Sequence, residues 1–153
     1  VELGPLSEEV LTDLAPLAEN KGIALNCAGD ALVIGSDTLL YRLVFNLVEN
    51  AIRYSRTGST VNVSICDNDS HVFLRVEDQG PGIPKQYRES IFQPFFRLDK
   101  SRSRAYGGAG LGLALVWEIA ALHGGTVEVE ESSENGTTIL VSLPKRSAAL
   151  TEQ

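Results

Sequence analysis

The sequence predicts an α+β fold: a two-layer α/β sandwich in which helices cover one face of a mainly antiparallel, mixed sheet. Segments with helical periodicity and segments with strand alternation are interspersed along the chain. Hairpin signals join neighbouring strands, at Asp67-Asn68-Asp69-Ser70 and at the favourable turn Asn135-Gly136. The order of elements is too irregular for a doubly wound parallel sheet.

Three helices are expected, at residues 7–21, 37–55 and 111–122. Ser7 and Asp37 are the predicted caps of the first two helices. Glycine pairs or Lys-Gly steps end the first and third. The predicted strands cover residues 1–3, 23–27, 31–34, 61–65, 72–76, 126–131 and 137–143.

Length and composition are ordinary for one soluble domain spanning residues 1–153, with a tail at 145–153 that is expected to fray. The formal net charge of -7 argues against a general nucleic-acid-binding protein, which carries a basic excess. No apolar run reaches the roughly 20 residues that span a bilayer, and no signal peptide is recognisable. Because Val1 is not a natural initiator residue, we expect a fragment of a longer protein.

The two cysteines, Cys27 and Cys66, lie in apolar, strand-like stretches without a Cys or His at metal-ligand spacing. We expect buried, reduced thiols rather than a disulfide, and therefore a reducing compartment.

A polar stripe runs along the second predicted helix, because Asn46, Glu49, Asn50 and Arg53 recur at helical spacing opposite the leucines. Two carboxamides and a guanidinium offer oxygen ligands for a magnesium ion and a cation for a phosphate group. A solvated helix face explains this segment equally well.

Two glycine-rich segments follow. Asp78-Gln79-Gly80-Pro81-Gly82-Ile83 comes directly after a strand, so that Asp78 can accept a hydrogen bond from an exocyclic amine such as adenine N6. Its glycines allow the backbone to approach a flat ring, although a simple turn is the alternative. The segment 107–113 leads into a helix, where backbone N–H groups and the helix dipole favour an anion. A flexible loop with a helix cap is the alternative there.

Together, in this order and with a long loop between the last two, these segments resemble the GHKL superfamily of gyrase-type ATPases and histidine kinases. The segment from Ile91 to Asp99, followed by Ser101-Arg102-Ser103-Arg104, looks like the F box and ATP lid of sensor histidine kinases. Leu122-His123-Gly124-Gly125 and the strand ending at Pro144 are similar as well. The resemblance covers the chain from about Ser7 to Pro144.

This resemblance implies the Bergerat ATP-binding fold, with residues 81–110 as the ATP lid and with ATP and Mg²⁺ as ligands. Asp78 is then the acceptor for the adenine amine, and Asn50 is the Mg²⁺ ligand. The other implied ATP-binding residues are Asn46, Arg53, Tyr54, Gly80, Gly82, Ile83, Arg102, Arg104, Gly108, Gly110, Leu111, Gly112 and Leu113.

One position separates the kinases from the ATPases of this superfamily. Gyrase-type ATPases carry a Glu that activates water four residues before the Mg²⁺-binding Asn, and this chain has Asn46 there. A carboxamide cannot act as a general base, and Glu49 is offset by one residue on the helix. We therefore expect ATP to be held without rapid hydrolysis, with positioning and charge neutralisation supplying most of the catalysis.

The resemblance further implies an acceptor His on a separate dimerisation hairpin, which this chain lacks; His71 and His123 are expected to be structural. The implied protein is a histidine kinase in a phosphorelay, whose partners are its own hairpin and a response regulator receiver domain. It also implies a full-length, membrane-associated homodimer with this domain in the cytoplasm. Phe92, Phe95 and Phe96 are the expected contact with the hairpin, whereas Trp117 is expected to lie in the core.

Two other functions are compatible with parts of the pattern. One is a self-contained GHKL ATPase or a serine kinase, against which the F box, the lid arginines and Asn46 count. The other is a module that senses a nucleotide without transferring a phosphoryl group.

Overall fold

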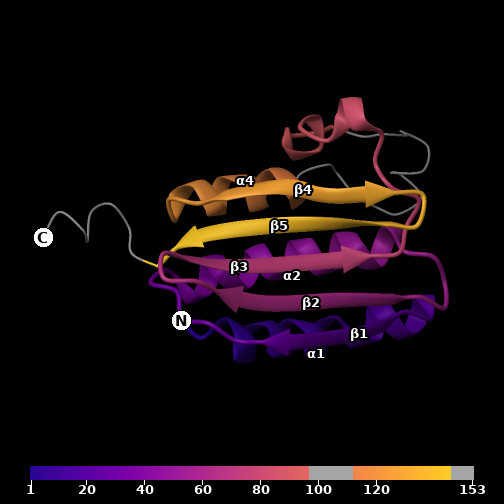
Figure 1. Ribbon diagram of the computed structural model, residues 1–153. Helices are drawn as coiled ribbons and strands as arrows, with labels where there is room; N and C mark the ends of the chain where they lie inside the picture. The colour runs from indigo at the N-terminus through magenta and orange to yellow at the C-terminus, as the bar shows by residue number, and fades with distance from the viewer. Residues whose placement is uncertain (97–111, 146–153) are drawn as a thin grey trace, which may run out of the picture.

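The computed structural model describes residues 1–96 and 112–145, which form one five-stranded sheet with three α-helices on one of its faces (Figure 1). The predicted two-layer α+β fold is confirmed. The helices are α1 (Leu3–Lys21), α2 (Asp37–Tyr54) and α4 (Gly112–Leu122). The strands are β1 (Ala24–Gly29), β2 (Thr60–Asp67), β3 (His71–Asp78), β4 (Thr126–Ser133) and β5 (Gly136–Pro144). Two 3₁₀ turns, η1 (Lys85–Tyr87) and η2 (Ser90–Phe92), lie between β3 and α4.

The sheet has the strand order β1-β2-β3-β5-β4. β1 runs parallel to β2, and the other neighbouring pairs are antiparallel, as expected for a mixed sheet. The end of β3 lies beside the start of β5, with Asp78 opposite Thr137. The end of β3, the β4–β5 turn and the C-terminal end of α2 therefore meet at the right-hand side of Figure 1.

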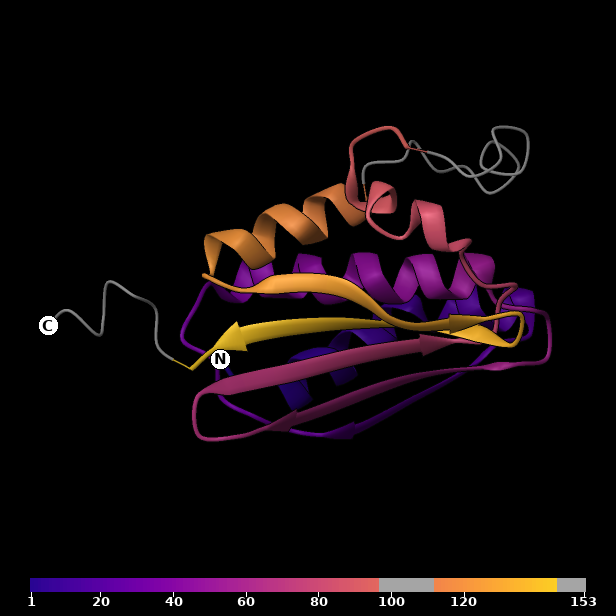
Figure 2. The ribbon, with the colours of Figure 1, turned by 45° about the horizontal axis from the view of Figure 1, so that its top comes forward.

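The core lies between the helices and the sheet, as Figure 2 shows from a second angle. α2 is the central helix and packs between α1 and α4. Its apolar residues recur at helical spacing and meet the alternating inward residues of the strands. The α2 residues that are at most 1% exposed are Leu40, Leu43, Val44, Leu47, Val48 and Ile52.

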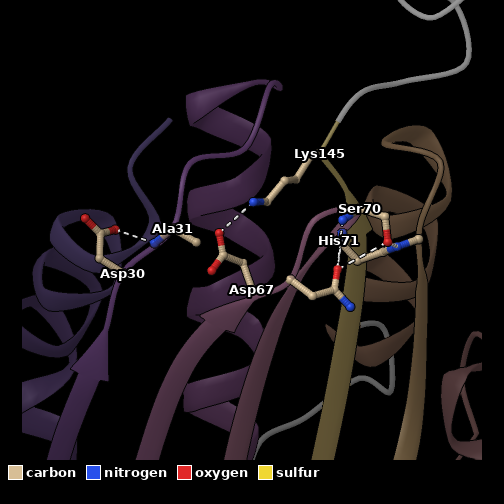
Figure 3. Close-up of polar contacts among 7 residues, drawn as sticks. Asp30, Ala31, Asp67, Ser70, His71 and Lys145 are labelled. Atoms are coloured by element: carbon tan, nitrogen blue, oxygen red, sulfur yellow. Dashed lines mark hydrogen bonds and ion pairs between the residues drawn. The ribbon is translucent and has the colours of Figure 1, made fainter.

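The start of α1 differs from the prediction. Residues 1–3 were expected as a strand and Ser7 as a cap, but α1 begins at Leu3, and Ser7 is buried within it. The reason is a contact across the fold: Asp30 Oδ1 accepts hydrogen bonds from the backbone of Gly4 (2.7 Å) and Ala31 (2.8 Å). Figure 3 shows the Asp30–Ala31 contact. Of the strand expected at 31–34, a single bridge between Glu2 and Leu32 remains.

Other boundaries are closer to expectation. α2 begins at Asp37, but its cap is Ser36, whose hydroxyl accepts from Leu39 N at 3.2 Å. Lys145 was expected in a frayed tail; instead its backbone N donates to Ser70 O, and its Nζ lies 2.8 Å from Asp67 Oδ2 (Figure 3). Residues 146–153 lie outside the described part of the chain.

Both cysteines are free thiols, as expected. Their expected burial is wrong, because Cys66 is exposed and Cys27 is only half-buried. Cys66 faces outward on β2, on the side of the sheet that the helices leave open. Among the described residues, no helix is long and apolar enough to cross a membrane.

Replacing Asp30 by Ala should lower the free energy of unfolding by about 1–2 kcal/mol, because the Gly4 N–H at the start of α1 loses its acceptor. Urea denaturation measures this loss. Asp69→Ala, in the exposed β2–β3 turn, removes the same charge and should change stability by no more than about 0.5 kcal/mol. Equal losses in the two variants would contradict the capping role of Asp30.

Candidate functional site

The carboxylate of Asp78 lies at the end of β3, where only 8% of the residue is exposed. Its Oδ1 accepts hydrogen bonds from the backbone N–H groups of Gly80 (2.9 Å) and Thr137 (3.2 Å). Burial raises the pKa of the Asp78 carboxyl above its usual value, and these two hydrogen bonds oppose that shift. Its Oδ2 accepts no hydrogen bond from any described residue. A fixed, buried acceptor with one free oxygen is suited to a ligand amine.

The glycines around Asp78 are required by close backbone packing. A Cβ on Gly80 would lie 2.3 Å from the Tyr54 carbonyl oxygen, and one on Gly82 would lie 2.1 Å from that of Ser133. Gly82 also has a φ of +85°, which favours glycine. The sequence interpretation was that these glycines admit a flat ring. The structure gives another reason: they allow the 78–83 segment to pack on α2 and on the β4–β5 turn.

A hydroxyl network behind Asp78 was missed by sequence reasoning. Thr137 is 4% exposed, and its hydroxyl lies 2.8 Å from that of Ser132, which also accepts from Ile83 N at 2.8 Å. Arg88 then donates to the carbonyl oxygens of Ser132 (3.0 Å) and Ile83 (3.3 Å). This network fixes the start of the segment that follows β3. The sequence gives little sign of this network, because Thr137 follows an ordinary Asn-Gly turn and its partner Asp78 lies 59 residues away in the chain.

The polar stripe on α2 is present as predicted. Glu49 and Arg53 form an ion pair, with Oε1 and Nε 3.7 Å apart. The Arg53 Nε is buried and has no hydrogen-bond partner among the described residues. The Asn50 carboxamide, half-buried, also makes no hydrogen bond with a described residue. An unsatisfied buried N–H costs about 1–3 kcal/mol, so an anionic ligand next to Arg53 fits the stripe.

Asn46 connects the stripe to α4. Its Nδ2 donates to the Arg42 carbonyl oxygen at 2.7 Å, and a Cβ on Gly112 would lie 3.3 Å from its Oδ1. The structure thus brings Asn46 of the α2 stripe close to Gly112 at the start of α4, which lies 66 positions further along the sequence. Leu113, just inside α4, packs on the core. Five predicted site residues lie outside the described part of the chain: Arg102, Arg104, Gly108, Gly110 and Leu111.

The aromatic residues beside the site divide into buried and exposed groups. Phe92 is 5% exposed and belongs to the core, Phe96 is half-buried, and Phe95 is 70% exposed. Trp117 was expected in the core, but it is 52% exposed on α4, with its ring 5.7 Å from that of Phe92. The expectation was wrong because the residues that α4 buries are Val116, Ile119 and Ala120, and Trp117 lies beside them at the edge of the buried face. Tyr54, at the end of α2, is 38% exposed.

The histidines have structural surroundings. The His123 Nε2 accepts from Ser36 N at 3.2 Å, and its Nδ1 lies 2.8 Å from the Ile119 carbonyl oxygen. It therefore joins the end of α4 to the start of α2. His71 Nδ1 lies 2.7 Å from the Ser70 hydroxyl in the β2–β3 turn.

The buried carboxylate, the polar helix stripe and the glycine at the start of α4 all fall within the part of the chain that a family model matches. The family model for histidine kinase-, DNA gyrase B- and HSP90-like ATPases matches residues 35–147, and the chain belongs to this family. The match covers α2, all four strands after it, and α4.

Two similar curated proteins are histidine kinases. The chain is 38% identical to the sensor-like histidine kinase SenX3 of Mycobacterium tuberculosis, over 94% of this chain and 36% of that protein. It is 38% identical to the sensor histidine kinase CpxA of Escherichia coli, over 94% of this chain and 32% of that protein. The chain therefore spans about one third of the length of the curated relatives it matches.

Among solved structures, the mycobacterial sensor histidine kinase MprB superposes with a TM-score of 0.80 at 32% identity, covering 96% of this chain and 97% of that one. Full-length ShkA in complex with AMPPNP superposes with a TM-score of 0.83 at 28% identity, covering 97% of this chain and 31% of that one.

Asp78→Asn should change how stability depends on pH. A carboxyl whose pKa is raised on folding favours the native state below its unfolded pKa, and this contribution is lost as the pH rises through the folded-state pKa. From its usual value of 3.8 upward, the wild type should therefore lose stability relative to Asp78→Asn. Urea denaturation from about pH 4 to 8 measures this difference. Asp69→Asn is the matched surface control, and a pH-independent difference for Asp78→Asn would contradict the cost of burying this charge.

Proposed function

We propose that this chain is the catalytic, ATP-binding domain of a two-component sensor histidine kinase. It transfers the γ-phosphoryl group of ATP to a His on a separate dimerisation hairpin, for relay to an Asp on a response regulator. The observation that supports this most strongly is a set of groups that make no hydrogen bond with a described residue: Oδ2 of Asp78, Nε of Arg53 and the carboxamide of Asn50. Their chemistry matches an adenine amine, a phosphate and a metal ion in turn.

In this proposal Asp78 binds the adenine amine, and Tyr54 and Ile83 flank the base. Arg53 pairs with phosphate oxygens, and Asn50 coordinates Mg²⁺, whose role is to neutralise charge on the phosphates. The glycine segment up to Gly112 supplies backbone donors at the start of α4. Residues 81–110 form the lid, with Arg102 or Arg104 for the γ-phosphate.

The chain's own residues position the reactants and leave hydrolysis slow. Asn46 has no group that accepts a proton, and its Nδ2 is held by the Arg42 carbonyl oxygen. Glu49 is engaged with Arg53. The nucleophile is then the imidazole of a His outside this chain, and orientation supplies most of the rate.

The contact with the hairpin is proposed for the aromatic surface beside the site. Phe95 and Trp117 expose 70% and 52% of their area, and Phe96, which follows Phe95 in the sequence, is half-buried. Phe92 is buried and supports the Trp117 ring from beneath. Exposed aromatic side chains of this size are typical of an interface. The whole protein is proposed to be a membrane-associated homodimer with this domain in the cytoplasm.

Calorimetry with ATP, ADP and GTP tests the assignment, with phosphate release followed in parallel. We expect binding of both adenine nucleotides, no binding of GTP and negligible hydrolysis. Asp78→Asn should weaken ATP binding by about two orders of magnitude, because an amide N–H₂ then faces the adenine amine. Asp69→Asn should bind as the wild type does. Rapid phosphate release would favour the ATPase instead, and equal GTP binding would refute the adenine assignment.

Asn50→Ala should remove the tightening of ATP binding by Mg²⁺ and leave metal-free binding within about threefold, because the Asp78 contact persists. The measurement is the ratio of Kd values with EDTA and with Mg²⁺. Asn20→Ala, at the exposed end of α1, is the control for a carboxamide lost elsewhere. Survival of the full Mg²⁺ effect in Asn50→Ala would show that another residue binds the metal.

A further inference from the structure

A groove of about 560 Å³ lies between α1 and the edge strand β1. Its lining includes the apolar residues Leu11, Ala15, Ala18, Ile23 and Leu25. Leu25 and Cys27 point toward the helix layer but stay half-buried, whereas their counterparts on β2, among them Val61 and Val63, are at most 1% exposed. The helix layer therefore stops short of the sheet edge. In Figure 1, α1 and β1 lie at the bottom of the molecule, and the segment after β3 lies at the top.

The backbone of β1 is open along this edge. The Ala24 N–H donates to the Ser59 carbonyl oxygen, on the β2 side. Because backbone groups alternate direction along a strand, the N–H and C=O groups of Leu25 and Cys27 point away from β2. These groups can pair with one more strand.

The two edges of the sheet differ in protection. β4, at the far edge, carries Glu128, Glu130 and Glu131 and a register shift between Val129 and Glu131. Charges and bulges of this kind keep an edge strand from pairing with another chain. β1 has the sequence Ala-Leu-Asn-Cys-Ala-Gly, without a charged residue or a proline.

The charged side chains that line the groove are two carboxylates, Glu8 and Glu19, both exposed on α1. Glu8 contacts Cys27 at one end of β1, where burial and this carboxylate raise the pKa of the thiol to about 11. Glu19 lies eleven residues further along α1, which corresponds to about 16 Å at 1.5 Å per residue. Two basic side chains four residues apart on a strand are separated by about 13 Å, and their length covers the rest.

We propose that this groove binds an extended peptide segment of another domain or protein, which adds to β1 as a sixth strand. The segment carries an apolar residue over Leu25, flanked on the same face by two Lys or Arg residues that pair with Glu8 and Glu19. Backbone pairing at Leu25 and Cys27 supplies affinity, and the flanking charges supply register and specificity. A second copy of this chain fits worse, because two α1 helices would bring Glu8 and Glu19 close to like charges.

The probe is the acetylated, amidated peptide Thr-Lys-Thr-Val-Thr-Lys-Thr, titrated against the ¹⁵N-labelled chain. We expect saturable binding with a Kd of up to about 1 mM, accompanied by shifts of the Leu25 and Cys27 amide signals. Two N-methylated peptides, each blocking one alternate set of amides, separate strand addition from charge attraction. One of them should lose binding and the other should keep it, because only one edge of the peptide faces β1.

Glu8→Lys/Glu19→Lys should weaken binding about tenfold, through repulsion of both peptide lysines. Glu128→Lys/Glu131→Lys changes the net charge equally at the far edge and should stay within about twofold. Equal weakening by both double variants, equal binding of both methylated peptides, shifts confined to other strands, or no binding at 1 mM each overturn the proposal. So does a concentration-dependent dimer that Leu25→Lys abolishes, because the occupant is then a second copy. ATP binding is unaffected in either case, so the result is independent of the proposed function.

Discussion

Burying the carboxylate of Asp78 imposes the constraint on which the rest of this site depends. An isolated charge at that depth is costly, and the fold offsets the cost with two backbone donors, Gly80 and Thr137, that come from different segments. Those donors reach it only because the backbone packs unusually closely: Gly80 against the Tyr54 carbonyl, and Gly136 with a would-be Cβ 2.1 Å from the Asp78 carbonyl oxygen. Side chains at these glycines would push apart α2, β3 and the β4–β5 turn together. The Asp78 carboxylate is thus held in place without a ligand, which in the proposed function lowers the entropic cost of binding.

α2 contributes to both the core and the candidate site through its two faces. Its leucines and valines fill the core between α1, α4 and the sheet, and its opposite stripe carries Asn46, Glu49, Asn50 and Arg53. Because the same helix also ends at Tyr54, whose carbonyl approaches Gly80, its position sets the spacing between the polar stripe and Asp78. Lys21 of α1 donates to the carbonyl oxygens of Ile52 and Arg53 at the C-terminal end of α2, so α1 also fixes this end of the helix. A shift of α2 would therefore alter the site and the core at once.

The layered fold, the mixed sheet and most element positions followed from local periodicity and turn chemistry, since β2, β3, β5 and α2 each carry a clear pattern. The failures have nonlocal causes. α1 begins at Leu3 because Asp30, far along the chain, provides the acceptor for Gly4, whereas the local signal favoured Ser7. Trp117 was placed in the core by its size, yet α4 buries a different side. Of the candidate site, Asp78 and the α2 stripe could be proposed from the sequence because each stands in a local motif. Thr137, Ser132 and Arg88 could not, because their contacts arise from strand register and from loops that meet at one end of the sheet.

The polar stripe also bears on the choice between hydrolysis and transfer. A base that activates water is a carboxylate or imidazole directed at the reacting phosphate. The α2 residue beside the start of α4 is Asn46, whose side-chain N–H donates to the Arg42 carbonyl oxygen of the same helix. Glu49, the one carboxylate on the stripe, lies 3.7 Å from the Arg53 Nε and would have to give up this ion pair to turn toward a water. Among the described residues of the α2 stripe, no carboxylate is therefore free to deprotonate water, in agreement with the proposed transfer to a histidine. Such a site gains catalytic power only when a nucleophile that needs no strong base, such as a neutral imidazole, is brought to it from outside.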